Sequence, residues 1–301
     1  MLLQDAGLIS RRFLLAESLG AVALLASAAD GATKKEKKEK VEDKVKDKKA
    51  GKKISIGVQL YSVREDCKRD LPGTIAAIAK MGYMGVEFAG YYDRKAAELR
   101  KMLDDNGLVC CGTHTAMDTL LGDNLSATIE FNKTLGNKFL VVPWLPENYR
   151  ASRQAWLDTA KLFNELAEKV KPQGMRIGYH NHDVEFKPMD GELPWDTFCS
   201  STSKDVIMQL DTGNALNGGA DPLPFLYRYP ERAVTVHLKE FSKKNDKALI
   251  GEGDINWKAF FALCKAVGGT EWYIVEQESY AYSPIDCIDR CLKNLRKMKL
   301  V

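Results

Sequence analysis

The sequence has 301 residues and an apolar fraction of 45%, which suits a globular protein with one large α/β domain and an appendage. Its formal net charge of +3 is unevenly distributed, because residues 34–53 hold eleven Lys against five Asp and Glu. The remainder is nearly neutral, which argues against nucleic acid as a partner. Seven cysteines without a Cys-x-x-Cys spacing predict buried thiols rather than a disulfide scaffold.

Residues 1–29 have the features of an export signal. Arg11 and Arg12 open an apolar run that ends in Ala-Ser-Ala at 26–28, a typical cleavage motif. The paired arginines resemble a twin-arginine signal, although the phenylalanine usually sits one residue later. We expect a bacterial periplasmic protein with no stable membrane span in the mature chain, since the run is short and alanine-rich. Residues 30–53 have few apolar side chains and are expected to form a disordered Lys/Glu-rich linker.

From residue 54 onward, strand-like and helix-like patterns alternate eight times. The expected strands cover 54–60, 83–88, 108–113, 138–142, 176–180, 206–211, 233–237 and 272–276. The expected helices cover about 71–81, 93–105, 125–135, 152–170, 194–200, 222–229, 257–267 and 284–298. Eight such units in about 250 residues favour a single (β/α)8 TIM barrel over residues 54–301. No glycine-rich phosphate or dinucleotide motif follows any of these strands.

Four strands in the second half of the chain each end in a potential metal ligand. These residues are His180, Asp211, His237 and Glu276. The carboxyl ends of barrel strands meet at one face, where TIM barrels carry their active sites. Two imidazoles and two carboxylates there would suit a divalent cation. The alternatives are a turn in which Asp211 bonds its own backbone and a core histidine at 237.

Other polar residues follow the same strand ends. Glu87 and His114 close the second and third strands, and His182 shares a face with His180 if that strand continues. The expected substrate-binding residues are Tyr61, Arg64, His182, Asn214 and Lys239. Several aromatic residues could stack on a sugar, although most barrel aromatics serve packing; they are Tyr91, Tyr92, Trp144, Trp195 and Trp257.

Several stretches of the chain resemble the xylose-isomerase-like barrel superfamily over about residues 54–301. They are Gly57-Val-Gln-Leu-Tyr-Ser-Val-Arg64, Tyr179-His-Asn-His-Asp-Val-Glu-Phe186, Leu210-Asp-Thr-Gly-Asn214, Val236-His-Leu-Lys239, Gly251-Glu-Gly-Asp-Ile255 and Val275-Glu-Gln277. Members of this superfamily include sugar phosphate isomerases/epimerases, ketose 3-epimerases, inosose dehydratase, 3-dehydroshikimate dehydratase and endonuclease IV.

The resemblance implies one divalent ion, Mn²⁺, Co²⁺, Mg²⁺ or Zn²⁺, held by Glu, Asp, His and Glu from strands five to eight. Asp211, His237 and Glu276 match the last three positions, but His180 stands where the family usually has Glu. The fourth ligand is therefore His180 or Glu185. Imidazole is a good metal ligand, so the metal site can survive the exchange, but proton transfer between two glutamates cannot be assumed. The catalytic candidates are Glu276, Glu87, His114 and Glu185, with His182 as a further candidate base.

The resemblance predicts a metal-dependent sugar isomerase/epimerase that acts through an enediolate. Because phosphorylated sugars belong to the cytoplasm, export favours an unphosphorylated sugar or keto-sugar as the substrate. The alternatives are a metal-dependent lyase or hydrolase of 3-keto-glycosides and a non-catalytic exported sugar-binding barrel. The near-neutral domain and only four histidines disfavour endonuclease chemistry. A homo-oligomer is compatible with the sequence.

Overall fold

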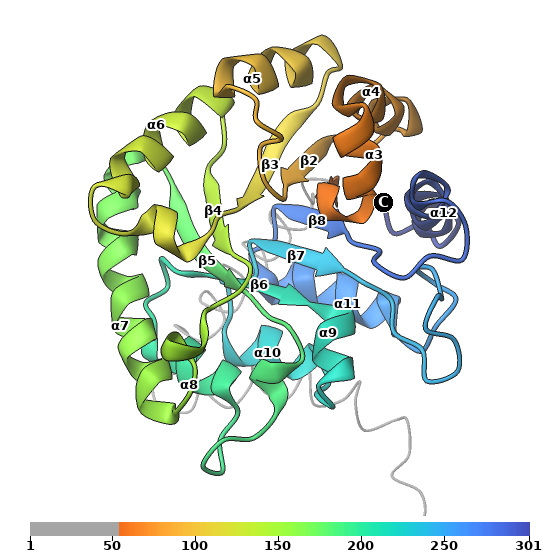
Figure 1. Cartoon of the computed structure of the whole chain (residues 1–301). Coiled ribbons are helices and arrows are strands. Elements are labelled where there is room, and N and C mark those ends of the chain that lie inside the picture. Colours follow the sequence, from red (N-terminus) through yellow and green to blue (C-terminus); the bar gives the residue numbers. More distant parts are fainter. Residues whose placement is uncertain (1–53) are drawn as a thin grey trace, which may run out of the picture. The chain divides into compact units, whose positions relative to one another are not determined.

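The computed structural model describes residues 54–301, which form a closed barrel of eight parallel strands surrounded by helices (Figure 1). Each strand pairs with the next, and β8 pairs with β1 to close the barrel. The strands are β1 (Ser55–Gln59), β2 (Gly85–Phe88), β3 (Val109–His114), β4 (Phe139–Val142), β5 (Arg176–His180), β6 (Ile207–Asp211), β7 (Thr235–Leu238) and β8 (Trp272–Val275). The single TIM barrel predicted from the sequence is confirmed, whereas the predicted export signal (1–29) and linker (30–53) lie outside the described residues.

Helices follow the strands and cover the outside of the barrel (Figure 1). They are α3 (Arg64–Arg69), α4 (Leu71–Met81), α5 (Ala96–Asp105), α6 (Asn124–Leu135), α7 (Arg153–Val170), α8 (Pro194–Ser201), α9 (Thr212–Asn217), α10 (Leu223–Arg228), α11 (Trp257–Leu263) and α12 (Pro284–Lys297). Short 3-10 turns are η1 (Leu60–Val63), η2 (Met117–Leu120), η3 (Glu147–Tyr149), η4 (Lys171–Gln173) and η5 (Val184–Phe186). A π-helical turn, η6 (Cys264–Gly268), continues α11.

Local sequence signals explain most helix boundaries. Asp70 accepts a hydrogen bond from the Gly73 amide at 3.0 Å and so caps α4, which ends at Gly82 in the left-handed conformation with φ of 94°. Ser152 caps α7 in the same way, accepting a hydrogen bond from the Ala155 amide. The sequence patterns missed α3 and α9. Both helices have only six residues, and α9 begins in Thr-Gly-Asn, which is typical of a turn.

The core lies in two layers, one inside the barrel and one between the strands and the helices. In the outer layer, α7 and α8 pack on β5 through edge-to-face contacts among Trp156, Phe163, Tyr179 and Phe198. All seven cysteines are free and buried, as predicted. Within residues 54–301, no helix combines the length and the apolar character needed to cross a membrane.

Candidate metal centre

The barrel brings the four strand-end residues of β5 to β8 together. His180 ends β5, Asp211 ends β6, His237 lies within β7, and Glu276 follows the last residue of β8. One ligand atom from each lies within 4.8 Å of the others, and all four side chains are buried. We call these four residues the ligand quartet. A second group of three imidazoles, His114, His180 and His237, overlaps with it.

Asp211 has two oxygens with different surroundings. Oδ1 accepts a hydrogen bond of 2.6 Å from the Asn214 amide and thereby caps α9. Oδ2 is buried without a hydrogen-bond partner and lies 3.9 Å from His237 Nδ1. Burial raises the pKa of Asp211 to about 7. A buried carboxylate oxygen without a partner is costly, so this atom is where a bound cation would compensate most.

Glu87 contacts the ligand quartet through His237, and both of its oxygens have hydrogen-bond partners. Oε1 accepts a hydrogen bond from Gln209 Nε2 at 2.8 Å. Oε2 accepts from Gln59 Nε2 at 2.8 Å and from His237 Nε2 at 2.6 Å, and lies 3.2 Å from His114 Nε2. Burial acts to raise the pKa of Glu87, but His114 and His237 lower it well below its usual range. Gly112 makes room for this carboxylate, because a Cβ there would collide with Oε1.

These contacts fix which nitrogen of each imidazole faces the ligand quartet. His237 Nε2 donates to Glu87, so its Nδ1 faces Glu276 Oε2 at 3.1 Å. His180 Nδ1 lies 3.0 Å from Gln209 Oε1, which can only accept, so Nδ1 carries a hydrogen and Nε2 keeps its lone pair. Orientation of ligating histidines by a second polar group is typical of metal sites. The donor set of two imidazoles and two carboxylates fits a divalent cation such as Zn²⁺, Mn²⁺ or Co²⁺.

Charges around His237 also fit this arrangement. Burial would lower its pKa, but the carboxylates of Glu87 and Glu276 raise the pKa of His237 to about 10. Burial, together with the neighbouring His237, holds the pKa of His180 well below its usual range. Without a cation, His237 therefore carries a positive charge between two carboxylates. A metal would replace the proton on Nδ1.

The structure separates the other candidate residues into two groups. Glu185 is buried away from the ligand quartet and accepts hydrogen bonds of 2.7 Å from the Tyr179 hydroxyl and from the His182 amide. Asn214 donates to the Asn181 carbonyl at 3.2 Å. Arg64 donates to the Tyr61 carbonyl at 2.8 Å and to the Tyr280 hydroxyl at 3.0 Å. Each of these three side chains therefore has a partner that ties two loops or elements together.

His182 and Lys239 lie beside the ligand quartet. The His182 ring is 5.0 Å from that of His180 and meets the exposed Trp144 edge-on at 5.1 Å. Its Nδ1 is buried without a partner, and burial lowers its pKa to about 4. Lys239 pairs with Glu278 and has its Nζ 3.9 Å from Glu276 Oε2. Burial opposes its charge, but Glu276, Asp211 and Glu278 raise the pKa of Lys239 above its usual range.

Gln209 belongs to the site although the sequence reasoning did not single it out. Its amide joins His180, His114 and Glu87, and it also donates to Thr235 at 2.9 Å. The available signal was an amide inside an otherwise apolar strand, two residues before Asp211 and so on the same face. Trp195 and Trp257 are buried in the core, so these two aromatics serve packing and are not available to stack on a sugar.

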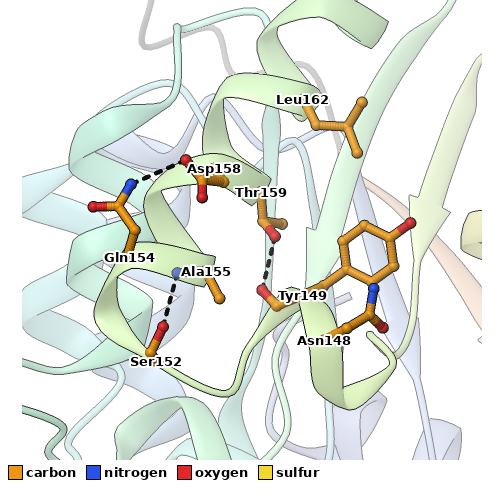
Figure 2. Close-up of a pocket in the computed structure, with 8 residues that line it drawn as sticks. All are labelled: Asn148, Tyr149, Ser152, Gln154, Ala155, Asp158, Thr159 and Leu162. Atoms are coloured by element: carbon orange, nitrogen blue, oxygen red, sulfur yellow. Dashed lines mark hydrogen bonds between the residues drawn. The ribbon is translucent and has the colours of Figure 1, made fainter.

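A pocket of about 390 Å³ lies on the outside of the barrel, where η3 meets α7 (Figure 2). Tyr149, Ser152, Asp158 and Leu162 are among its lining residues, and their polar groups are partly used within α7. The Thr159 hydroxyl, for example, donates to the Tyr149 carbonyl at 2.7 Å (Figure 2). None of the residues lining this pocket belongs to the ligand quartet.

The fold and site together define an α/β barrel with polar ligands gathered at the carboxyl ends of its strands. The family model of the xylose isomerase-like TIM barrel matches residues 75–298, and the chain belongs to this family. It is 25% identical over 245 residues to an inosose dehydratase of Serratia proteamaculans, covering 68% of this chain and 81% of that protein.

Two solved structures share the fold of this chain. A sugar phosphate isomerase/epimerase from Parabacteroides distasonis shares 26% identity with a TM-score of 0.71, covering 84% of this chain and 96% of the other. The IolI protein, solved with a bound zinc atom, has a TM-score of 0.64 and 15% identity, covering 82% of this chain and 98% of the other. Proteins similar to this chain therefore carry both dehydratase and isomerase/epimerase names, and residue groups able to hold a metal are present in this chain.

Proposed function

We propose that this protein is a metal-dependent lyase acting on an unphosphorylated keto-sugar or keto-polyol. It would remove the proton next to the carbonyl, form an enediolate and expel a group from the adjacent carbon. The ligand quartet carries this proposal, because Asp211 Oδ2 is a buried carboxylate oxygen without a hydrogen-bond partner that lies among three other potential ligands. A divalent cation held by His180, Asp211, His237 and Glu276 would supply Lewis-acid stabilisation of the developing oxyanion.

Elimination is favoured over epimerisation by the residue on β5. Epimerisation through two glutamates needs a carboxylate on each side of the reacting carbon, and the ligand quartet has His180 in place of one of them. An elimination needs only one base, which removes the proton. The leaving group then departs, so no second group has to return a proton to the opposite face. The similarity to an inosose dehydratase over 81% of that protein supports the same choice.

The chain offers groups for the remaining steps. His182 Nδ1 has no partner and lies beside the ligand quartet, so its imidazole is our candidate for the base. Lys239 stays protonated beside Glu276 and can donate a hydrogen bond to negative charge that develops on the substrate. Tyr61 and Trp144, with 41% and 44% of their surface exposed, present rings on which a sugar can pack.

The unphosphorylated substrate rests on two arguments. The first is the export signal expected in residues 1–29, from which we also propose a periplasmic location. The second concerns charge, since two cations near the strand ends, Lys239 and Arg64, already have partners. Lys239 pairs with Glu278, and Arg64 bonds to Tyr61 and Tyr280. A phosphate would have to compete with those partners.

Proton NMR in D2O tests the proposal directly. The full chain is loaded with Mn²⁺, Co²⁺ or Zn²⁺ and given keto-cyclitols, keto-sugars and their glycosides. We expect loss of the proton next to the carbonyl together with an unsaturated or dehydrated product, and neither change with Glu276→Gln. If no substrate in this panel exchanges or eliminates with any of the three metals, the lyase proposal is wrong.

A sugar isomerase/epimerase is the second candidate. The Parabacteroides distasonis structure with 26% identity over 84% of this chain carries that name. The same NMR experiment separates the two, because an isomerase would incorporate deuterium into an isomer of the substrate without releasing any group.

A further inference from the structure

A second pocket lies at the rim of the barrel, on the side of β2 and β3. It has a volume of about 350 Å³, within the range of about 300–1,000 Å³ that small-molecule sites occupy. The loop after β2 contributes Tyr91, and the end of β3 contributes His114 and Thr115. Ala127 and Phe131 line it from α6, the helix that follows β3 (Figure 1). We call it the rim pocket.

The rim pocket shares a wall with the candidate metal centre. His114 lines it, and the ring of His114 lies 5.0 Å from that of His180 and 5.3 Å from that of His237. The ligand quartet comes from β5 to β8, whereas the rim pocket is built on the elements after β2 and β3. A ligand in the rim pocket would therefore lie against His114, whose ring stands beside two members of the ligand quartet.

The walls of the rim pocket combine an aromatic face with hydroxyl groups. Tyr91 and Phe131 pack against each other with ring centroids 4.2 Å apart, and both are only half-buried. Three hydroxyl oxygens surround them, from Thr115, Thr119 and Thr128. Each hydroxyl donates its hydrogen to a backbone carbonyl, so its oxygen is left to accept from a ligand. A pyranose ring has apolar C–H faces and a polar edge, which is the chemistry that such a wall accommodates.

Buried hydrogen bonds hold these walls in place. Asn132 is fully buried and donates to the Tyr91 hydroxyl at 3.2 Å and to the Thr128 carbonyl at 2.9 Å. Its Oδ1 accepts from Asn137 Nδ2 at 2.9 Å and from the Thr113 hydroxyl at 3.2 Å. The rim pocket is therefore preformed, and a ligand would not have to order it.

We infer that the rim pocket binds a second sugar ring, so that the substrate is a glycoside of a keto-sugar and not a free monosaccharide. This inference rests on the proposed lyase activity and specifies its leaving group. The C–H bond next to the carbonyl breaks and its proton passes to His182, while the electron pair forms a C=C bond. The C–O bond to the second ring breaks, and the departing oxygen takes a proton from water.

Filling the rim pocket tests this inference. Ala127→Trp places a large ring at an exposed lining position, and Ser126→Trp is the matched control, because Ser126 is exposed on the same helix and does not line the pocket. The substrates are a disaccharide with one oxidised ring and the methyl glycoside of the same keto-sugar. We expect Ala127→Trp to lower kcat/KM for the disaccharide by about tenfold, the loss of about 1.4 kcal/mol. The methyl glycoside should be unaffected.

A second variant and a binding measurement separate this inference from the lyase proposal. Phe131→Leu leaves the rim pocket open and removes its stacking face, so it should also weaken binding of the disaccharide. Calorimetry with the unoxidised disaccharide measures binding without turnover. If both variants weaken binding of the disaccharide and the wild type turns over neither substrate, the rim pocket is supported and the lyase proposal is contradicted. Turnover of both substrates that neither variant changes would support the lyase and overturn the rim pocket.

Discussion

Two buried carboxylates near the strand ends differ in how their oxygens are used. Around Glu87, on the β1–β3 side, both oxygens accept hydrogen bonds and the pKa lies well below its usual range. Around Asp211, on the β5–β8 side, one oxygen caps α9, the other has no partner, and burial raises the pKa to about 7. Because unsatisfied buried groups are costly, the carboxylate of Glu87 is placed to position side chains and that of Asp211 to bind a cation.

Loss of a ligand from the second region should have the largest effect. Glu276→Gln keeps the side-chain volume but removes one anionic ligand and the charge that faces His237 and Lys239. We expect elimination to fall by about 10³-fold or more, because a bound cation contributes several kcal/mol of stabilisation. Steady-state assays at saturating metal measure this. Activity within tenfold of wild type would show that Glu276 is not a metal ligand needed for catalysis.

His182 supplies the next test, since it separates metal binding from proton transfer. His182→Ala should lower kcat by about 10²-fold or more, the usual contribution of a general base. Its metal content should stay at the wild-type level, because the ligand quartet does not include His182. A primary deuterium isotope effect on kcat that grows in the variant would show that proton removal has become slower. An unchanged kcat would show that another residue is the base.

A smaller effect is expected when the positioning region is weakened. Glu87→Gln removes the carboxylate that accepts from His237 Nε2, so metal affinity should fall by about 10–100-fold. The control is Glu185→Gln, which changes another fully buried carboxylate that has no contact with the ligand quartet. Competition with a chromophoric chelator measures both affinities. If both variants lost the same metal affinity, Glu87 would contribute to general stability and would have no specific role in positioning His237.

The pH dependence of the metal-free protein gives the smallest effect. The pKa of His237 rises from 6.5 to about 10 in the folded state, so its charged form stabilises the fold fully below pH 6.5. That contribution is lost as the pH rises through 10. Melting temperatures of the metal-free protein should therefore fall between pH 7 and 10, and the decline should be shallower in His237→Gln. A steeper decline in the variant would contradict the assignment.

The barrel and the ligand quartet could be predicted because both depend on local patterns. Apolar strands that end in His180, Asp211 or Glu276 place those residues at one face once the barrel closes. The role of Glu87 could not be predicted in the same way. Its oxygens are occupied by Gln59, Gln209, His114 and His237, which lie between 27 and 150 residues away in the sequence and meet only inside the barrel.

Asp211 shows how one residue can satisfy two interpretations of the sequence. The turn in which it bonds its own backbone and the metal ligand were treated as alternatives. In the structure, Oδ1 accepts a hydrogen bond from the Asn214 amide, and Oδ2 has no hydrogen-bond partner and faces the other members of the ligand quartet. The cap fixes the carboxylate so that its second oxygen points towards His237. No sequence pattern distinguishes the two oxygens of one side chain.

Metal analysis of the full chain tests the central claim most directly. Wild type, Asp211→Ala and the control Glu185→Gln are reconstituted with Mn²⁺, Co²⁺ and Zn²⁺, dialysed and measured by mass spectrometry. We predict about one equivalent of a divalent metal in wild type and in Glu185→Gln, and none in Asp211→Ala. Wild-type protein that retains no metal, or Asp211→Ala that retains as much as wild type, would contradict a metal centre at the strand ends.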